Sequence, residues 1–262
     1  MEFQTLKFEE VEAGIGCLTL NRPERLNALS LEMLGELHSF LNLIKTRPEI
    51  RVLVLTGEGR GFCSGFDLKD ERLQKEAAQF LSNPGLHLTA VQKKYGDLVV
   101  EMRKVPQPLI AAVKGPAAGG GMCLALASDV ILAGPGATFT PSFINIGLSG
   151  GEMGTTYFLP RLVGSTRAAE ILMTGRTVEA VEAERIGLVC RIVPEDLLFS
   201  AALEIARRMI AKTPLGLRFT KEAMYLNADA TLEAAVELEN RNQSICCSNP
   251  DFLKAVVAFQ KK

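Results

Sequence analysis

The chain has 262 residues, of which 47% are hydrophobic and 23% are charged, and its formal net charge is −1. This length and composition are typical of one large globular domain, or of a main domain with a small appendage. The near balance of acidic and basic residues does not favour a protein that binds nucleic acid or an anionic membrane surface. No stretch approaches the roughly 18 uninterrupted apolar residues of a membrane-spanning helix. We therefore expect neither nucleic acid nor a membrane among the partners.

The N-terminal sequence and the cysteines both favour a cytoplasmic protein. MEFQTLKFEE is acidic and alternating, unlike the basic and then apolar start of a secretory signal. The six cysteines are scattered, and the one adjacent pair, Cys246 and Cys247, is poorly suited to form a disulfide with itself. Reduced thiols are typical of the cytoplasm.

The first quarter of the chain predicts a hairpin, a helix and a buried strand. Residues 3–23 alternate around Gly14, which predicts a β-hairpin that ends near Pro23. Ser30 is a good helix cap, and apolar residues recur behind it at helical spacing. A continuous apolar strand is expected at 51–55, before a glycine-rich loop.

The following residues predict an α/β core and then a helical region. Residues 71–88 are polar and irregular, so we expect a surface excursion there. After a helix predicted near 90–104, PLIAAVKG and DVILAG predict two more buried strands, and near-continuous apolar strands favour an α/β fold with covered sheet faces. From about residue 165 the pattern is almost wholly helical.

Several catalytic signatures can be dismissed. GLSGG, at 147–151, matches the G-x-S-x-G pattern, but His38 and His87 both precede it, whereas an α/β-hydrolase needs a later histidine. The glycines of TGEGRGF miss the dinucleotide-binding spacing. Two distant histidines, and cysteines without metal spacing, predict no zinc site. We expect both histidines to be structural or solvated.

Two glycine-rich loops directly follow buried strands: GRGFCSGFDL at 59–68 and GPAAGGGM at 115–122. Neighbouring strands of such a sheet deliver these loops to one crevice. Backbone N–H groups from two loops could converge there on one oxygen and form an oxyanion hole. Tight turns beneath close helix packing explain the glycines equally well, so both interpretations stay open.

The sequence resembles the crotonase, or enoyl-CoA hydratase/isomerase, superfamily over nearly its whole length. The blocks that carry the resemblance, in family order, are LTLNRPERLNALS, RVLVLTGEGRGFCSGFDLK, PLIAAVKGPAAGGGMCLALASDVILA, GLSGGEMGTTYFLPRLVG and AAEILMTGRTVEAVEAERIGLVCRIVP. The resemblance implies a β–β–α spiral core, which we assign to residues 1–195, and a helical C-terminal region at 196–262. It also implies acyl-CoA thioester substrates, no cofactor apart from coenzyme A within the substrate, and assembly as a homotrimer or hexamer.

The resemblance also implies a set of site residues. The backbone N–H groups of Ser64 and Gly120 would form the oxyanion hole for the thioester carbonyl. The segment that holds the adenine and phosphates of coenzyme A corresponds to Arg25, Leu26 and Ala28. The remaining substrate-binding residues would be Ser64, Gly65, Phe66, Asp67, Leu68, Gly120 and Phe143. Of these, we expect Asp67 to brace its loop rather than to touch the substrate.

The sequence departs from typical hydratases at both family glutamates, whose positions are taken by Cys123 and Phe143. Glu152 remains, and its spacing to Pro160 resembles that of the catalytic glutamate in peroxisomal-type Δ3,Δ2-enoyl-CoA isomerases. Glu152 is thus the candidate acid/base, although a carboxylate there could simply stabilise the N-terminus of the next helix. We expect Cys123 to be a small core residue, because free cysteine is among the most buried types.

The number of acids favours isomerisation. Double-bond migration needs one base that carries a proton between Cγ and Cα, whereas hydration suits two positioned carboxyls. Apolar surroundings, namely Phe143, Ile146 and Phe158, are expected to raise the pKa of Glu152. A hydratase that uses Glu152 alone, an acyl-CoA thioesterase or decarboxylase, and a non-catalytic acyl-CoA binder remain as alternatives. The sequence does not identify the acyl chain.

Overall fold

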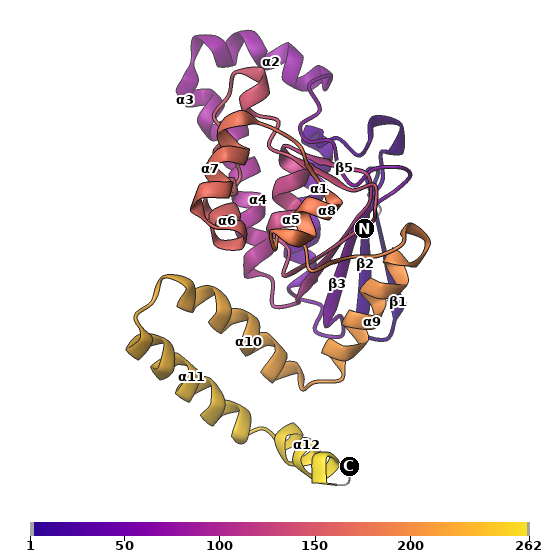
Figure 1. Cartoon of the computed structure of the whole chain (residues 1–262), viewed down its shortest axis with the longest axis vertical. Helices are drawn as coiled ribbons and strands as arrows, with labels where there is room; N and C mark the ends of the chain where they lie inside the picture. Colours follow the sequence, from indigo (N-terminus) through magenta and orange to yellow (C-terminus); the bar gives the residue numbers. More distant parts are fainter. Residues whose placement is uncertain (1–2, 261–262) are drawn as a thin grey trace.

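The structure is a computed structural model that describes residues 3–260, apart from the side chains at 76–81, 84, 90 and 259. Figure 1 shows an α/β body with sheet and helices packed together, from which a run of C-terminal helices extends. This arrangement confirms the predicted α/β fold with a helical C-terminal region.

A six-stranded sheet in the order β1-β2-β3-β4-β6-β9 forms the centre of the body. Its strands are β1 (Leu6–Glu12), β2 (Ile15–Leu20), β3 (Val52–Gly57), β4 (Leu109–Val113), β6 (Val130–Ala133) and β9 (Arg191–Ile192). Strands β1 and β2 pair antiparallel, as the predicted hairpin requires, and Gly14 takes the left-handed φ of +81° at the turn. All other neighbours in this sheet are parallel, so β3 and β4 deliver their following loops to the same edge.

A smaller sheet carries the second glycine-rich loop. It consists of β5 (Pro116–Ala118), β7 (Thr138–Thr140) and β8 (Val178–Glu179). Strand β5 runs parallel to β7 and leads almost directly into helix α5 (Gly120–Leu126). The glycine triplet therefore spans the junction between a strand and a helix.

The large sheet is covered on both faces. In β3, Leu53 and Leu55 belong to one apolar cluster with helices α1 (Leu31–Ile44) and α4 (Lys93–Lys104). Val52 and Val54 alternate with them and pack, on the opposite face, with helix α9 (Leu198–Ile210). The Ser30 side chain accepts a hydrogen bond from Met33 N at 3.1 Å, which confirms the predicted cap of α1.

The segment 71–88 lies at the surface where its side chains are described, as predicted, but it is helical rather than irregular. The segment forms α2 (Glu71–Ser82) and α3 (Pro84–His87), and a π-helical turn, Leu88–Gln92, then leads into α4. Asp70 and Asn83 side chains cap the two helices by accepting from Arg72 N at 2.9 Å and Leu86 N at 3.1 Å. Such side-chain caps supply the partners that the first helical N–H groups otherwise lack.

The C-terminal part is helical apart from the short strands β8 and β9. Its α-helices are α6 (Thr155–Val163), α7 (Ser165–Thr174), α8 (Ala180–Arg185), α9, α10 (Pro214–Leu226), α11 (Leu232–Cys247) and α12 (Pro250–Gln260). Although α9 follows the predicted boundary at 195/196, it packs on the large sheet, and the helices that extend away in Figure 1 begin with α10. Within the described residues, no helix combines the length and apolarity that crossing a membrane requires.

Candidate active site

The two glycine-rich loops meet at the N-terminal turn of α5. A Cβ added at Gly121 would overlap the carbonyl oxygen of Cys63, and one at Gly65 would lie 2.7 Å from the carbonyl oxygen of Ala118 and 3.4 Å from Gly120 N. The predicted convergence of the loops is therefore confirmed. The tight-packing interpretation holds for Gly121, because only a residue without Cβ allows this backbone approach.

Two backbone amides at this junction have no acceptor within the described residues. Leu29 N donates to Gly65 O at 2.7 Å and Asp67 N donates to Leu29 O at 3.0 Å, so the intervening Phe66 amide points to the opposite side of this short bridge. The Gly120 amide opens α5, where the first N–H groups have no intrahelical partner. The Phe66 ring also lies 3.1 Å from the place that a Cβ of Gly120 would take.

The amide of Ser64, in contrast, is already engaged. Ser64 N donates to Leu26 O at 3.0 Å, and the Ser64 hydroxyl donates to Arg25 O at 3.3 Å. This bonding corrects the expectation that Ser64 N–H is free to bind a substrate oxygen. Sequence reasoning missed Phe66 as a donor because the direction of a backbone amide in a loop has no sequence signal.

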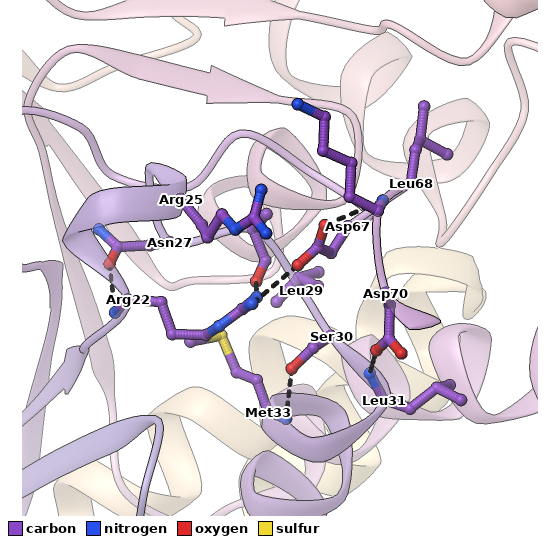
Figure 2. Close-up of polar contacts among 12 residues, drawn as sticks. Arg22, Arg25, Asn27, Leu29, Ser30, Leu31, Met33, Asp67, Leu68 and Asp70 are labelled. Carbon is purple, nitrogen blue, oxygen red and sulfur yellow. Dashed lines mark hydrogen bonds and ion pairs between the residues drawn. The ribbon is translucent and has the colours of Figure 1, made fainter. Parts of the chain in front are cut away.

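The segment Arg25–Ala28 forms a strained turn next to the β3 loop, and Figure 2 shows Arg25 and Asn27 of this turn. Leu26 and Asn27 both take left-handed φ angles, of +50° and +55°, which non-glycine residues rarely adopt. The buried Asn27 side chain secures the turn, because its Oδ1 accepts from Arg22 N at 2.8 Å and its Nδ2 donates to Gly61 O at 2.9 Å. Arg25 is exposed and is free to contact a ligand.

Asp67 points into the protein and braces its loop, as expected. Its Oδ2 lies 2.8 Å from Arg22 Nη2, and its Oδ1 accepts from Lys69 N at 3.1 Å (Figure 2). Arg22 Nη1 also donates to Ala28 O at 2.6 Å, which joins the two segments. Leu68, next to Asp67, is largely exposed. A cavity of about 240 Å³ adjoins this pair and is lined by Arg22, Arg25, Ser30, Glu32, Asp67, Lys69, Asp70, Glu71 and Arg72.

An aromatic cluster closes the other side of the glycine junction. The Phe66 ring centroid lies 4.1 Å from that of Tyr95 and 5.4 Å from that of Phe143. The Phe143 ring lies 3.5 Å from the position that a Cβ of Gly119 would take, so the predicted substrate-binding residue Phe143 is at the junction. Tyr95 is buried on α4, and sequence reasoning missed it because it reads as an ordinary core position.

Glu152 lies in the turn before α6 and is held at both carboxylate oxygens. Gln92 Nε2 donates to Oε2, and Met153 N donates to Oε1 at 3.1 Å. Met153 takes a left-handed φ of +43°, a conformation that costs free energy and is typical of functional turns. Burial raises the pKa of the Glu152 carboxyl, while the Gln92 and Met153 hydrogen bonds and the charge of His87 oppose this shift.

The Cys123 thiol joins Glu152 to the glycine triplet. Its Sγ lies 3.2 Å from Gly119 O and 3.6 Å from Glu152 O, so Glu152 adjoins the N-terminal turn of α5. Cys123 is fully buried and burial raises its pKa, which confirms the expected core residue. Of the apolar residues expected around Glu152, Phe143 and Phe158 are buried, but Ile146 is 54% exposed and does not shield the carboxyl from water.

The two histidines differ in their surroundings. His38 Nδ1 lies 2.9 Å from Glu101 Oε2 and its Nε2 lies 2.9 Å from Lys94 O, so His38 is structural, as predicted. His87 is half-buried on α3, and its charge acts on Glu152. This influence does not test the prediction that His87 is structural or solvated. In the part of the chain that the structure describes, no group of three or more His, Cys, Asp or Glu side chains could hold a metal ion.

A larger cavity, of about 790 Å³, lies between α4, α6 and α10 rather than at the glycine junction. Its walls include Val99, Arg103, Phe158, Lys221 and Tyr225. None of the substrate-binding residues predicted from the sequence lines it. We place the candidate active site at the glycine junction, because the two free amides lie there and the half-buried Glu152 adjoins the same turn of α5 through its contact with Cys123.

Comparison with known proteins identifies the family to which the chain is similar. The sequence profile of the enoyl-CoA hydratase/isomerase family matches residues 10–262. A probable enoyl-CoA hydratase of Mycobacterium tuberculosis is 43% identical over 90% of this chain and 82% of its own length. The 1,2-epoxyphenylacetyl-CoA isomerase of Escherichia coli is 36% identical over 96% of this chain and 94% of its own. The crystal structure of an enoyl-CoA hydratase from Bacillus anthracis superposes with a TM-score of 0.90, at 31% identity, over 98% of this chain and 96% of its own.

Proposed function

Because the chain belongs to the enoyl-CoA hydratase/isomerase family, we propose that it is an enzyme that moves the double bond of an enoyl-CoA. One observation carries this proposal: the half-buried acid Glu152 adjoins the first turn of α5, where its backbone carbonyl oxygen lies 3.6 Å from Cys123 Sγ, and this turn presents the free amide of Gly120. The neighbouring acid Asp67 is engaged with Arg22. One base is sufficient for a 1,3-proton transfer.

The oxyanion hole in this proposal consists of the amides of Phe66 and Gly120, with Phe66 in place of Ser64. Both amides lack an acceptor within the described residues, and they come from loops locked together by the Cys63–Gly121 contact. Two such donors would stabilise the negative charge that develops on the thioester oxygen. Removal of one donor from an oxyanion hole typically lowers the rate by about 10²–10³.

Glu152 would carry the proton. Its carboxylate takes a proton from Cα of a 3-enoyl-CoA, so that the C–H electron pair enters the dienolate and the negative charge lies on the thioester oxygen. The resulting carboxylic acid returns the proton to Cγ, which gives the 2-enoyl-CoA and restores the carboxylate. Burial supports this role because it raises the pKa of Glu152 and makes the carboxylate a stronger base near neutral pH.

Coenzyme A would bind along Arg25, Leu26 and Ala28, with Gly65, Phe66 and Leu68 beside the pantetheine and acyl group. The exposed cations of the 240 Å³ cavity, among them Arg25 and Arg72, suit the phosphates of such a substrate. No further cofactor enters the proposal. The six cysteines are free thiols, which suits a reducing compartment such as the cytoplasm.

A homotrimer or hexamer is also part of the proposal. Helices α11 and α12 expose large apolar side chains, with Leu232 at 82%, Leu253 at 65% and Val257 at 51% exposure. Exposed apolar side chains grouped on projecting helices support burial between subunits.

Hydration of a 2-enoyl-CoA is the second candidate, because the relative in Mycobacterium tuberculosis has the name of a hydratase. A single carboxyl can in principle handle both protons of water. Incubation of the wild-type protein with a 3-enoyl-CoA and, separately, with a 2-enoyl-CoA distinguishes the two candidates. We expect the 3-enoyl-CoA to become conjugated, and little water addition to the 2-enoyl-CoA. The opposite pattern would establish the hydratase, and binding without any turnover would establish an acyl-CoA binder.

A further inference from the structure

The side chain that binds the Glu152 carboxylate, Gln92, comes from the helical segment between β3 and β4. The π-helical turn Leu88–Gln92 joins α3 to α4 without a non-helical residue between them. A π turn inserts an extra residue into a helix and so changes the direction of the side chains around it. Here Val91 packs into the core at 5% exposure, while the next residue, Gln92, is half-buried and faces Glu152.

Gln92 binds one particular oxygen of the Glu152 carboxylate. Gln92 Nε2 binds Oε2 of the carboxyl, whereas Oε1 is bound by Met153 N, so the two oxygens have different partners. The Glu152 backbone is fixed as well, because its N–H donates to Thr155 Oγ1 at 3.1 Å. A carboxylate with donors on both oxygens has little freedom to rotate.

We propose that Gln92 is a positioning residue for Glu152, which it holds in one orientation and favours as the carboxylate. This inference rests on the proposed role of Glu152 as the base. A base must be ionised to accept the Cα proton, and an amide donor stabilises the ionised carboxyl more strongly than the neutral acid. The π turn is then the device that brings the amide to Glu152.

The other groups around Glu152 also affect the balance between its carboxylate and its protonated form. From α3, the charge of His87 favours the carboxylate, as Gln92 does. From α5, the Cys123 thiol is neutral, because burial raises its pKa. Burial of Glu152 itself favours the protonated acid. Without the Gln92 amide, fewer interactions would oppose the effect of burial, and the pKa of Glu152 would therefore rise further.

Two substitutions test the proposal. Gln92→Met keeps the length of the side chain and removes the donor, and Gln92→Glu replaces the donor by a second acid. Gln4→Met, at an exposed position before β1, is the matched control. Two quantities are measured for each variant: the pH profile of kcat/KM for isomerisation, and the titration of the Glu152 carboxyl by ¹³C NMR of glutamate-labelled protein, with Glu152→Gln used for assignment.

We expect the acid limb of the profile, and the carboxyl titration, to move to higher pH in Gln92→Met and further in Gln92→Glu. Below the limb, kcat/KM of Gln92→Met should fall about tenfold, and it should recover as the pH rises. The control should match the wild type.

The two readouts separate the failure of this inference from the failure of the proposed function. An unshifted carboxyl titration in Gln92→Met overturns the inference, and so does a loss of activity that is uniform across pH. A shifted titration in a protein that does not isomerise any 3-enoyl-CoA supports the contact and overturns the proposed function.

Discussion

The carbonyl oxygen of Cys63 occupies the space in which any other residue at position 121 would place its Cβ, so Gly121 and Cys63 lock the two glycine-rich loops together. This contact joins the end of the β3 loop to the first turn of α5. It brings the amides of Phe66 and Gly120 to one place, although they lie far apart in the sequence.

Gly121→Ala should therefore destabilise the protein by about 1–3 kcal/mol, because the added methyl group meets backbone rather than a flexible side chain. Urea unfolding at equal protein concentration measures this change. Gly35→Ala is the matched control, because Gly35 is exposed within α1 and a Cβ there meets no atom within 4 Å. The control should be more stable than the wild type by about 0.4–1 kcal/mol. Equal stability of both variants would refute the close contact.

Replacement of single backbone amides by esters tests the choice of Phe66 over Ser64. An ester at Phe66 removes a donor that has no acceptor within the described residues, so we expect kcat to fall by about 10²–10³. An ester at Ser64 breaks the bond to Leu26 O and should cost about 0.5–1.5 kcal/mol of stability, with little loss of kcat. The reverse result would restore Ser64 as the oxyanion donor.

The stability of the protein should depend on pH through Glu152. Burial raises its pKa in the folded state above the ordinary value of 4.5, so the folded protein binds this proton more tightly than the unfolded chain. The resulting stabilisation is complete below the unfolded pKa and is lost as the pH rises through the folded pKa. Glu152→Gln lacks this titration.

Relative to the wild type, Glu152→Gln should thus gain stability as the pH rises from the ordinary value of 4.5 through the raised pKa of Glu152 in the folded state. Urea unfolding of both proteins at each pH measures the difference. A difference that is independent of pH would mean that the pKa of Glu152 is the same in the folded and unfolded states.

Much of the fold could be predicted from the sequence, because its strands are short apolar runs between turn residues. The segments that became β3, β4 and β6 are almost purely apolar, and Ser30 is a strong helix cap. The helices at 71–92 escaped prediction because their residues are polar, and their caps, Asp70 and Asn83, act through side-chain bonds that a polar segment does not reveal.

Some residues of the candidate site could likewise be predicted from the sequence, and others could not. Gly120 and Asp67 could be placed through the family resemblance, and Cys123 through the tendency of free cysteine to be buried. The free amide of Phe66 depends on the pairing of its neighbours with Leu29. The Gln92–Glu152 contact joins residues 60 positions apart, and no pattern within either segment indicates it.

The most direct test of the account compares wild type, Glu152→Gln and the control Glu9→Gln in the isomerisation of a 3-enoyl-CoA. Glu9 is exposed on β1, so its variant should match the wild type. We expect Glu152→Gln to lower kcat by about 10²–10⁴, the usual contribution of a general acid/base, while the substrate still binds. Isomerisation by Glu152→Gln at the wild-type rate would contradict the central claim that this one carboxyl carries the proton.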